Sequence, residues 1–431
     1  MMLTSSSTFE LVRREIRYAY EHVEFFREHM ERAGLLPEAI VEPADMLRLP
    51  PTRKADYRRG FPARVVASGY SRRSAHVMRF SSSGTAGERL VSVVLAYDLA
   101  RRQASCLEFN PRFESLWQPG LRVRTCRYAA PNCSDVECSD PGSSTASRLL
   151  PDGTLVLPVF HDLLATPPEL TGRALDEIEA YDPHHLFVDP THFAFLIRAM
   201  GKAGRRPHKR KGLCISSGYT LCTHIARRQI RDCYGPEVPF ADMLGMSELG
   251  YLGFECPDGG LHVNTSDYYL EFIRDGRPAQ PGELAELVIT TLDDRLSPHI
   301  RYATGDLYRV RAEPCPCGAS APAVTAEGRA TNLLWRDDGT VLTPRGLDDV
   351  IGSAPWLDIY RMTQTPDGFT FQFVANDAWT AELERSLADR LRETLEAGSL
   401  ACLSTTYIPS ERGGKFVSCV STVAAGRGGW G

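Results

Sequence analysis

Serine, threonine and glycine crowd the stretch from Phe80 to Arg89, which reads FSSSGTAGER. Small residues let backbone N–H groups approach an anion closely, and hydroxyl groups add further donors. The stretch is not a Walker loop, because no Lys-Ser or Lys-Thr pair follows Gly87. The β-favouring runs at 77–80 and 90–95 predict a loop between two strands. A phosphate-gripping loop and a flexible turn fit this stretch equally well when it is taken alone.

Three further polar clusters have chemistry suited to a nucleotide. Ser247 and Glu248 follow the apolar run at 240–244, and a hydroxyl beside a carboxylate at a strand end suits Mg²⁺, which prefers oxygen ligands. Asp306 follows a glycine turn, where an acid commonly binds a ribose diol. Lys415 lies in RGGKF, whose glycines predict a mobile loop. Taken singly, each cluster is more simply explained as a turn or a surface ion pair.

Three thiols and an imidazole form another candidate cluster. Cys256 and His262 flank one loop-like stretch, and Cys315 and Cys317 occupy a second. Four such ligands satisfy tetrahedral zinc, and a closed set would be structural. However, Cys-x-Cys is tighter than the usual spacing, and metal-free cysteines are commonly small buried hydrophobes. Cys133 and Cys138 form an alternative pair of cysteines, to which no role is assigned.

Composition predicts an ordinary globular protein. The chain has 431 residues with 43% hydrophobic and 24% charged residues, which predicts two or three domains. A net charge of −5 gives no general attraction to nucleic acid. No stretch approaches the ~18 apolar residues of a membrane span, and the first residues do not resemble a signal peptide. We therefore expect a cytoplasmic protein with reduced cysteines and without a nucleic-acid or membrane partner.

Helical and strand patterns alternate along the first two thirds of the chain, which predicts a layered α/β domain with largely parallel sheets. The expected helices cover 9–33, 97–109, 170–181, 191–201 and 222–233. The expected strands cover 121–126, 154–160, 185–188 and 212–216, followed by a β-rich section at 268–273, 284–291, 300–302 and 307–310. From about residue 330, a hairpin at 358–375 and a helix at 380–397 predict a small α+β domain.

The order of the motifs is more informative than any one of them. SSSGTAGER, LGMSELG, PHIRYATGDL, GRATN and GGKF follow one another as in the adenylate-forming superfamily of acyl- and aryl-CoA synthetases, which the chain resembles. The segments FFREHMERAGLLPEAI, LRLPPTRKADYRRGFP, ECPDGGLHVN, GELAELVITTLDD and CPCG are similar to the phenylacetate–CoA ligase-like branch. The resemblance spans nearly the whole chain and is weakest over 111–158.

The resemblance implies both a fold and a reaction. Residues 1–328 would form a large N-terminal domain that binds ATP and substrate, and residues 329–431 a small mobile lid domain. A carboxylic acid, expected to be aromatic, would attack the α-phosphate of ATP bound with Mg²⁺, which gives an acyl-adenylate and pyrophosphate. The thiol of coenzyme A would then attack this mixed anhydride and expel AMP. The protein must stabilise the charge that develops on the phosphorus.

By this resemblance, particular residues would take particular roles. The residues expected to hold ATP are Ser82, Ser83, Gly84, Thr85, Gly87, Ser217, Gly218, Tyr219, Asp306 and Arg329. Those before residue 90 would bind the β- and γ-phosphates, and the last two the ribose. Residues 217–219 would line the adenine, with Tyr219 either stacking on the base or bordering the acyl pocket. Ser247 and Glu248 would act on the α-phosphate and Mg²⁺. Lys415 would bridge the acid and the α-phosphate until the small domain swings away.

Similar cysteine and histidine positions bind zinc in some relatives. The resemblance therefore favours a structural Zn²⁺ held by Cys256, His262, Cys315 and Cys317.

Three positions depart from the family pattern. Glu88 stands where the family loop often has lysine, so Arg89 must compensate or the loop must turn Glu88 outward. The junction at 330–332 reads Ala-Thr-Asn where acids usually follow Gly-Arg, which questions the domain swing. Tyr219 stands where the branch often has an acid, and this leaves base recognition open.

Alternatives to a CoA ligase keep the adenylation step but change the acceptor or the substrate. They are an amide ligase, the loading of a carrier protein, phenol adenylylation and a nitrite-activating diazotase. A catalytically dead binding protein on the same fold is an alternative of another class, against which the presence of Glu248, Asp306 and Lys415 argues. The sequence allows a homodimer and does not fix the oligomeric state.

Overall fold

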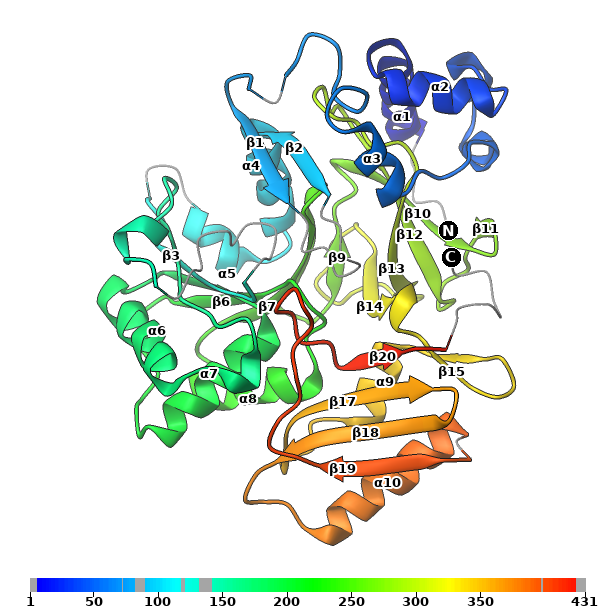
Figure 1. The fold of residues 1–431 in the computed structure, drawn as a ribbon. Helices are drawn as coiled ribbons and strands as arrows, with labels where there is room; N and C mark the ends of the chain where they lie inside the picture. The colour runs from blue at the N-terminus through cyan, green and yellow to red at the C-terminus, as the bar shows by residue number, and fades with distance from the viewer. Residues whose placement is uncertain are drawn as a thin grey trace. The chain divides into compact units, whose positions relative to one another are not determined.

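The computed structural model describes residues 6–71, 73–81, 90–117, 121–131, 142–396 and 398–423. The chain forms two compact units, one made of residues 1–111 with 243–326 and the other of 112–242 with 327–431. It passes from one unit to the other three times, at the start of α5 (Pro111–Glu114), inside β7 (Phe240–Met246) and inside β14 (Ala323–Arg329). Each unit is therefore assembled from two separate segments of the chain (Figure 1).

The first unit opens with short helices and a hairpin. Its early elements are α1 (Ser6–His22), α2 (Glu24–Arg32), η1 (Pro37–Ala39), η2 (Pro43–Arg48), α3 (Lys54–Gly60), β1 (Val77–Ser81), β2 (Val91–Leu95) and α4 (Ala96–Leu107). The prediction of one helix over 9–33 is wrong. Val23 is extended, at φ −121° and ψ 108°, and the N–H of Phe25 donates to the carbonyl of Arg64 at 3.0 Å. A tertiary hydrogen bond thus replaces one that a continuous helix would make.

The sheet of the first unit has the strand order β11-β10-β12-β13-β14-β9-β8. Its remaining strands are β8 (Gly250–Glu255), β9 (Leu261–Val263), β10 (Tyr268–Arg274), β11 (Arg277–Pro278), β12 (Ala285–Thr291) and β13 (Tyr302–Val310). The separate strands expected at 300–302 and 307–310 form the single strand β13. Gly305, at φ +75°, keeps the chain in the strand across an irregularity in its register with β12. Apolar side chains of α1, such as Ile16, share a buried cluster with Leu270 and Ile289.

The second unit contains a parallel sheet in the order β4-β3-β5-β6, to which the first residues of β7 add. Its elements before β7 are α5 (Pro111–Glu114), η3 (Ser115–Trp117), β3 (Thr125–Tyr128), η4 (Ala146–Arg148), β4 (Thr154–Val156), η5 (Leu163–Ala165), α6 (Pro168–Tyr181), β5 (His185–Val188), α7 (Pro190–Lys202), β6 (Cys214–Ser217) and α8 (His224–Tyr234). The expected alternation of helices with short parallel strands is confirmed. The buried strand β5 reads HLFV and is covered on all its residues, as parallel strands usually are.

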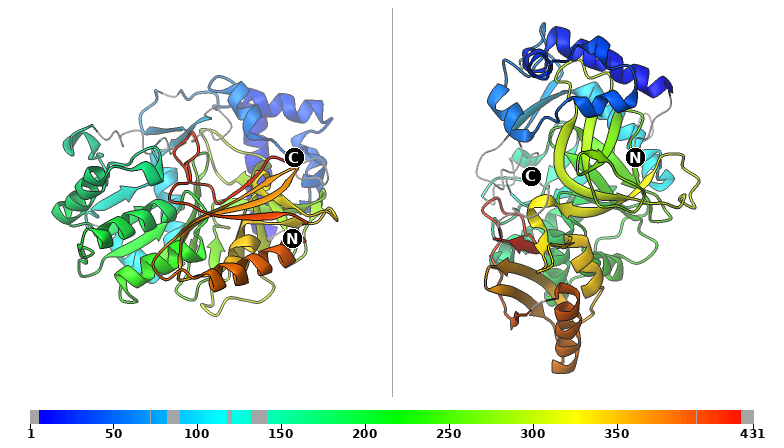
Figure 2. Two further views of the ribbon diagram at one scale, coloured as in Figure 1. Left: turned by 60° about the horizontal axis from the view of Figure 1, so that its bottom comes forward. Right: turned by 90° about the vertical axis from the view of Figure 1, so that its right-hand side faces the viewer.

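The C-terminal part of the second unit is a small α+β layer. Its elements are η6 (Ala330–Asn332), β15 (Leu334–Trp335), β16 (Val341–Leu342), α9 (Pro344–Ile351), β17 (Leu357–Thr365), β18 (Gly368–Ala375), α10 (Ala381–Leu395), β19 (Leu400–Ser404) and β20 (Cys419–Ser421). The sheet order is β19-β18-β17-β20, and α9 and α10 cover one face (Figures 1 and 2). The predicted hairpin and helix are both present. The domain boundary at 328/329 stays a prediction, since 327–431 share one compact unit with 112–242.

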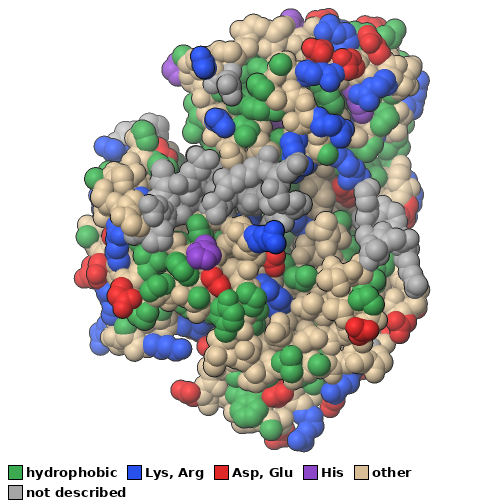
Figure 3. Space-filling model, in the orientation of Figure 1, with side chains coloured by type: hydrophobic (Ala, Val, Ile, Leu, Met, Phe, Trp, Pro, Cys, Tyr) green, Lys and Arg blue, Asp and Glu red, His purple; other side chains and the backbone are tan. Residues whose placement is uncertain are grey.

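The described helices and the drawn surface show ordinary globular character. Within the ranges that the structure describes, no helix combines the length and the apolar composition needed to cross a bilayer. On the face shown in Figure 3, basic and acidic side chains are interspersed rather than gathered in one area.

The buried face of β18 predicts a strong effect of truncation. Phe371 is 1% exposed and stacks on Phe373 with ring centroids 5.5 Å apart. Phe371→Ala should lower the free energy of unfolding by about 3–5 kcal/mol, because it opens a cavity that the β-sheet cannot close. The measurement is the shift in urea midpoint, with Leu383→Ala on the exposed side of α10 as the control, expected within about 0.5 kcal/mol. Equal midpoints for the two variants would contradict this core assignment.

Candidate active site

The predicted phosphate loop has the flanks that the sequence indicates. Strands β1 and β2 pair antiparallel, with Phe80 opposite Ser92 and Ser81 opposite Val91. The two predicted strands on either side of the loop are therefore confirmed. The loop residues themselves lie outside the described part of the chain; they are Ser82, Ser83, Gly84, Thr85, Gly87, Glu88 and Arg89.

The backbone around Ser247 and Glu248 is held by buried hydrogen bonds in the first unit. The hydroxyl of Ser92 donates to the carbonyl of Ser247 at 2.8 Å. The guanidinium of Arg102, which is fully buried, donates to the carbonyl of Leu249 at 3.1 Å. The two residues that the sequence singles out therefore sit on a rigid support at the end of β7.

Lys54 is a member of this cluster that the sequence did not indicate. Its Nζ lies 3.1 Å from Oε1 of Glu248, whose side chain is 8% exposed. Lys54 opens α3, and no spacing rule connects it with a residue almost two hundred positions later. The ion pair places a positive charge next to the carboxylate expected to hold Mg²⁺. The set Lys54, Ser247 and Glu248 thus offers both a cation and oxygen ligands to a phosphate with its metal ion.

Asp306 lies within β13 rather than in a turn. Its N–H donates to Oγ1 of Thr304 at 3.1 Å, and the N–H of Gly305 donates to Oε1 of Glu286 at 3.1 Å. These bonds fix an irregularity of the strand and leave the carboxylate of Asp306 half-buried. Such a group suits hydroxyl recognition, because a carboxylate accepts from two adjacent hydroxyls.

The end of β6 in the second unit carries the predicted adenine segment. The Ser217 hydroxyl donates to the Asp242 carboxylate, and the Gly218 N–H donates to the carbonyl of Val188 at 3.0 Å. Tyr219 has φ +72°, a left-handed conformation that is costly for an aromatic residue. Its ring stacks on Phe187 at 4.8 Å. The strained backbone turns the carbonyl of Tyr219 out of the strand ladder and presents it as an acceptor.

Lys415 meets this segment within the same unit. Its Nζ donates to the carbonyl of Tyr219 at 3.1 Å. Gly414, at φ +81°, allows the approach, since a Cβ there would lie 3.0 Å from Cδ and 3.1 Å from the carbonyl oxygen of Pro131. The glycine that the sequence associated with mobility also serves here to seat the loop against Pro131.

The junction residues belong to the second unit. Arg329 ends β14 and is exposed, whereas Asp306 lies in the first unit. Next to it, Asn332 donates through Nδ2 to the carbonyl of Cys419 at 2.6 Å. The predicted site residues therefore form two groups, Ser247, Glu248 and Asp306 in one unit and Ser217–Tyr219, Arg329 and Lys415 in the other.

The cysteine and histidine cluster comes together as the sequence suggested. The candidate ligand atoms of Cys256, His262, Cys315 and Cys317 all lie within 4.8 Å of one another. The Sγ atoms of Cys256 and Cys315 are 3.6 Å apart, close to the ~3.8 Å expected across a tetrahedral zinc with Zn–S bonds of ~2.3 Å. Nδ1 of His262 lies 2.8 Å from the carbonyl of Ala321, which fits a ring that donates there and offers Nε2 to a metal.

Gly260 lies against this cluster of cysteine and histidine side chains. A Cβ at Gly260 would lie 2.6 Å from Sγ of Cys315 and 3.1 Å from Nε2 of His262, so that only glycine leaves room at the centre. Its N–H also points to Sγ of Cys256 at 3.3 Å, a bond that stabilises a thiolate. The donor set, its spacing and its supporting hydrogen bonds fit zinc.

The chain is similar to known proteins over most of its length. The chain is 26% identical over 329 residues to phenylacetate-coenzyme A ligase of Thermus thermophilus, covering 72% of this chain and 66% of the relative. It is 26% identical over 306 residues to phenylacetate-coenzyme A ligase of Escherichia coli, covering 68% and 64%. The chain thus spans about two thirds of the length of these relatives. No family model matches the sequence.

A solved structure decides the fold. The crystal structure of 2-hydroxyisobutyryl-CoA ligase in the postadenylation state, in complex with 2-HIB-AMP, superimposes with a TM-score of 0.72 at 17% identity. The match covers 95% of this chain and 89% of the other. The chain is similar in sequence and in fold to adenylate-forming CoA ligases. The sequence relatives are named phenylacetate-coenzyme A ligase, which is the branch that the motif order indicated. The predicted mixed α/β fold of this superfamily is confirmed.

Proposed function

We propose that this protein is an ATP-dependent ligase that activates a carboxylic acid, expected to be aromatic, as an acyl-adenylate and transfers the acyl group to coenzyme A. The fold shared with an adenylate-forming CoA ligase and the relatives named phenylacetate-coenzyme A ligase support the proposal. The observation that carries it is the 3.1 Å bond between Nζ of Lys415 and the carbonyl of Tyr219. It brings the single lysine of the glycine-rich loop to the segment expected to border the nucleotide.

In the first half-reaction, a carboxylate oxygen of the acid attacks the α-phosphorus and pyrophosphate leaves. Negative charge grows on the phosphoryl oxygens, and fixed positive charges lower the barrier. Lys415 would supply such a charge and hold the acid in line. Lys54 and Glu248 would orient the phosphates, and Mg²⁺ held by Glu248 and Ser247 would supply further neutralisation. Asp306 and Arg329 would bind the ribose, and Ser217–Tyr219 would line the adenine.

In the second half-reaction, the thiol sulfur attacks the acyl carbon and AMP leaves. Lys415 has no role in this step, because the departing phosphate is already activated as part of the anhydride. The junction at 330–332 reads Ala-Thr-Asn where acids usually follow Gly-Arg in the family, which questions the swing of the small α+β layer. An acceptor that reaches the adenylate without the swing, such as an amine, is therefore the second candidate.

The first experiment tests adenylation without an acceptor. Pyrophosphate release with Mg·ATP over a panel of aromatic and aliphatic acids should reveal at least one substrate, since the first half-reaction needs no thiol. Adding coenzyme A should then yield the thioester mass, whereas amines should not give an amide. A panel with no pyrophosphate from any acid would contradict the adenylation proposal.

Lys415 should matter far more than other lysines. Lys415→Ala should lower adenylation by roughly 10²–10³-fold, the usual effect of losing a transition-state charge donor. Lys202→Ala, on the exposed end of α7, is the matched control and should retain full activity. Pyrophosphate release under saturating ATP is the measurement. If both variants kept wild-type rates, Lys415 would have no part in the mechanism.

The same proposal includes a structural zinc ion in the first unit. Cys256, His262, Cys315 and Cys317 would hold it, and a closed set of four protein ligands leaves no open position for catalysis. The ion would fasten the β8–β9 turn to the segment before β14 and would contribute to folding rather than to chemistry.

Metal analysis of the purified protein should therefore give about one zinc per chain. Cys256→Ser should abolish the stoichiometric zinc, and Gly260→Ala should weaken it, because its Cβ would crowd Sγ of Cys315 at 2.6 Å. Cys402→Ser, in β19 of the other unit, should leave the zinc content unchanged. A wild-type protein without zinc, or a Cys256→Ser variant that retains it, would show that these thiols are not ligands.

A further inference from the structure

Asp189 is a fully buried carboxylate at the start of α7, in the second unit. Its Oδ1 accepts from the N–H groups of Thr191 at 3.0 Å and His192 at 3.2 Å, so that it caps the helix. A cap does not require a charge, since asparagine and serine cap helices as well as aspartate does. Capping alone therefore does not account for a buried carboxylate at this position.

The second oxygen of Asp189 leads to Lys415. Oδ2 accepts from the hydroxyl of Thr220 at 3.2 Å. Thr220 directly follows Tyr219, whose carbonyl accepts from Nζ of Lys415 at 3.1 Å. The hydroxyl of Thr220 thus meets the carboxylate, and the carbonyl of the preceding residue meets the ammonium. Burial strengthens the attraction between opposite charges because it reduces screening by water, and Asp189 is fully buried.

The electrostatics of the cluster agree with a charged carboxylate. Burial by itself would raise the pKa of Asp189, but His192 and Lys415 nearby bring the pKa below its ordinary value. His192 lies on the capping oxygen, with Nδ1 3.2 Å from Oδ1.

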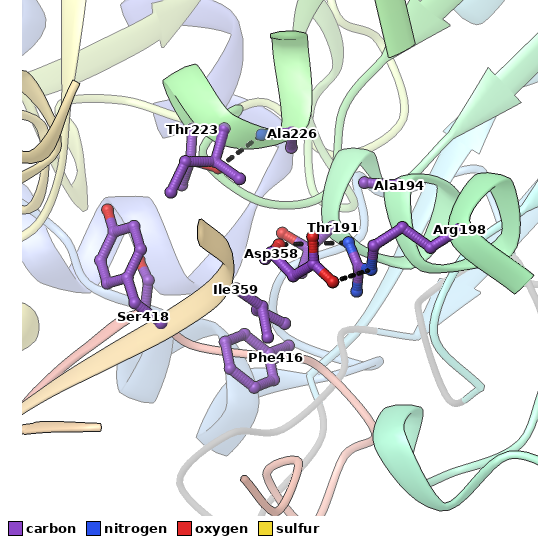
Figure 4. A pocket seen from close by; sticks show the side chains of 11 residues that line it. Thr191, Ala194, Arg198, Thr223, Ala226, Asp358, Ile359, Phe416 and Ser418 are labelled. Atoms are coloured by element: carbon purple, nitrogen blue, oxygen red, sulfur yellow. Dashed lines mark hydrogen bonds and ion pairs between the residues drawn. The ribbon is translucent and has the colours of Figure 1, made fainter. Parts of the chain in front are cut away.

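The loop that carries Lys415 is seated by apolar packing. Phe416 is 3% exposed and clusters with Leu163, Ile359 and Ile408. Figure 4 shows Phe416 beside Ile359, with the ion pair of Arg198 and Asp358 close by at 3.7 Å. The cavity between them measures about 20 Å³, which is room for about one water molecule and not for a substrate. The packing of Phe416 thus holds the loop at the residue next to Lys415.

We propose that Asp189 is the positioning residue of Lys415: its carboxylate, through Thr220 and the carbonyl of Tyr219, keeps the ammonium where adenylation needs it. The inference rests on the proposed function and deepens it. When Lys415 leaves, Asp189 stays behind as a buried charge without this partner, which is unfavourable. Asp189 therefore favours the docked state and the first half-reaction, and it has no part in the attack by the thiol.

Asp189→Asn tests the charge and keeps the cap. Asparagine is nearly isosteric and caps helices equally well, so the fold should persist. We expect adenylation to turn over about tenfold more slowly with KM for ATP unchanged, because the loss concerns Lys415 and not nucleotide binding. In the Lys415→Ala background the same change should cost nothing more. Asp176→Asn, an exposed acid on α6, is the matched control and should keep wild-type rates.

A second readout needs no substrate. Amine labelling of the intact protein, followed by mass spectrometry, should modify Lys415 several-fold faster in Asp189→Asn than in wild type, with Lys202 as the internal reference. Unchanged labelling of Lys415, or equal rate losses with and without Lys415, would overturn the inference. If wild type released no pyrophosphate with any acid, the proposed function would fail, whereas the labelling would still decide whether Asp189 holds Lys415.

Discussion

The carbonyl of Tyr219 and the ammonium of Lys415 form the hydrogen bond on which the candidate site of the second unit depends. It joins residues 196 positions apart in the sequence. On each side of the bond a residue has a positive φ angle. Tyr219 adopts a left-handed conformation, and Gly414 adopts one that only glycine enters freely. The strain at Tyr219 is retained because the stacking on Phe187 and the neighbouring hydrogen bonds outweigh it. The unfavourable backbone conformation of Tyr219 thus places its carbonyl as an acceptor for Lys415.

Regular elements were predictable wherever one periodicity dominated. Strand His185–Val188 and the hairpin around residue 367 match their patterns, because buried apolar residues and turn residues act locally. The break between α1 and α2 was not predictable. It depends on a hydrogen bond from Phe25 to Arg64, and no helix-breaking residue marks it. Likewise, glycine at 305 signals a turn in the sequence but serves as an irregularity inside a strand.

The candidate site residues also divide into those that the sequence indicated and those that it did not. Motif order predicted roles for Ser247, Glu248 and Lys415, because a resemblance summed over the chain is stronger than any one cluster. Lys54 and Asp189 escaped notice. Lys54 reaches Glu248 across the fold, and Asp189 reads as an ordinary helix cap beside a proline. Both owe their character to partners that only tertiary structure supplies. The cluster proposed to hold zinc is intermediate, since its four candidate ligands were visible in the sequence and the close approach at Gly260 was not.

The interleaving of the two units has a consequence for synthesis of the protein. Residues 1–111 emerge from the ribosome first, yet the strands that complete their unit, 243–326, follow after a long insertion. The early helices and the β1–β2 hairpin must therefore remain unfinished until most of the chain has been made, with part of their apolar surface uncovered. The insertion has its own parallel sheet and can begin to fold meanwhile. A chain built this way cannot be cut into two contiguous fragments that each retain a whole unit.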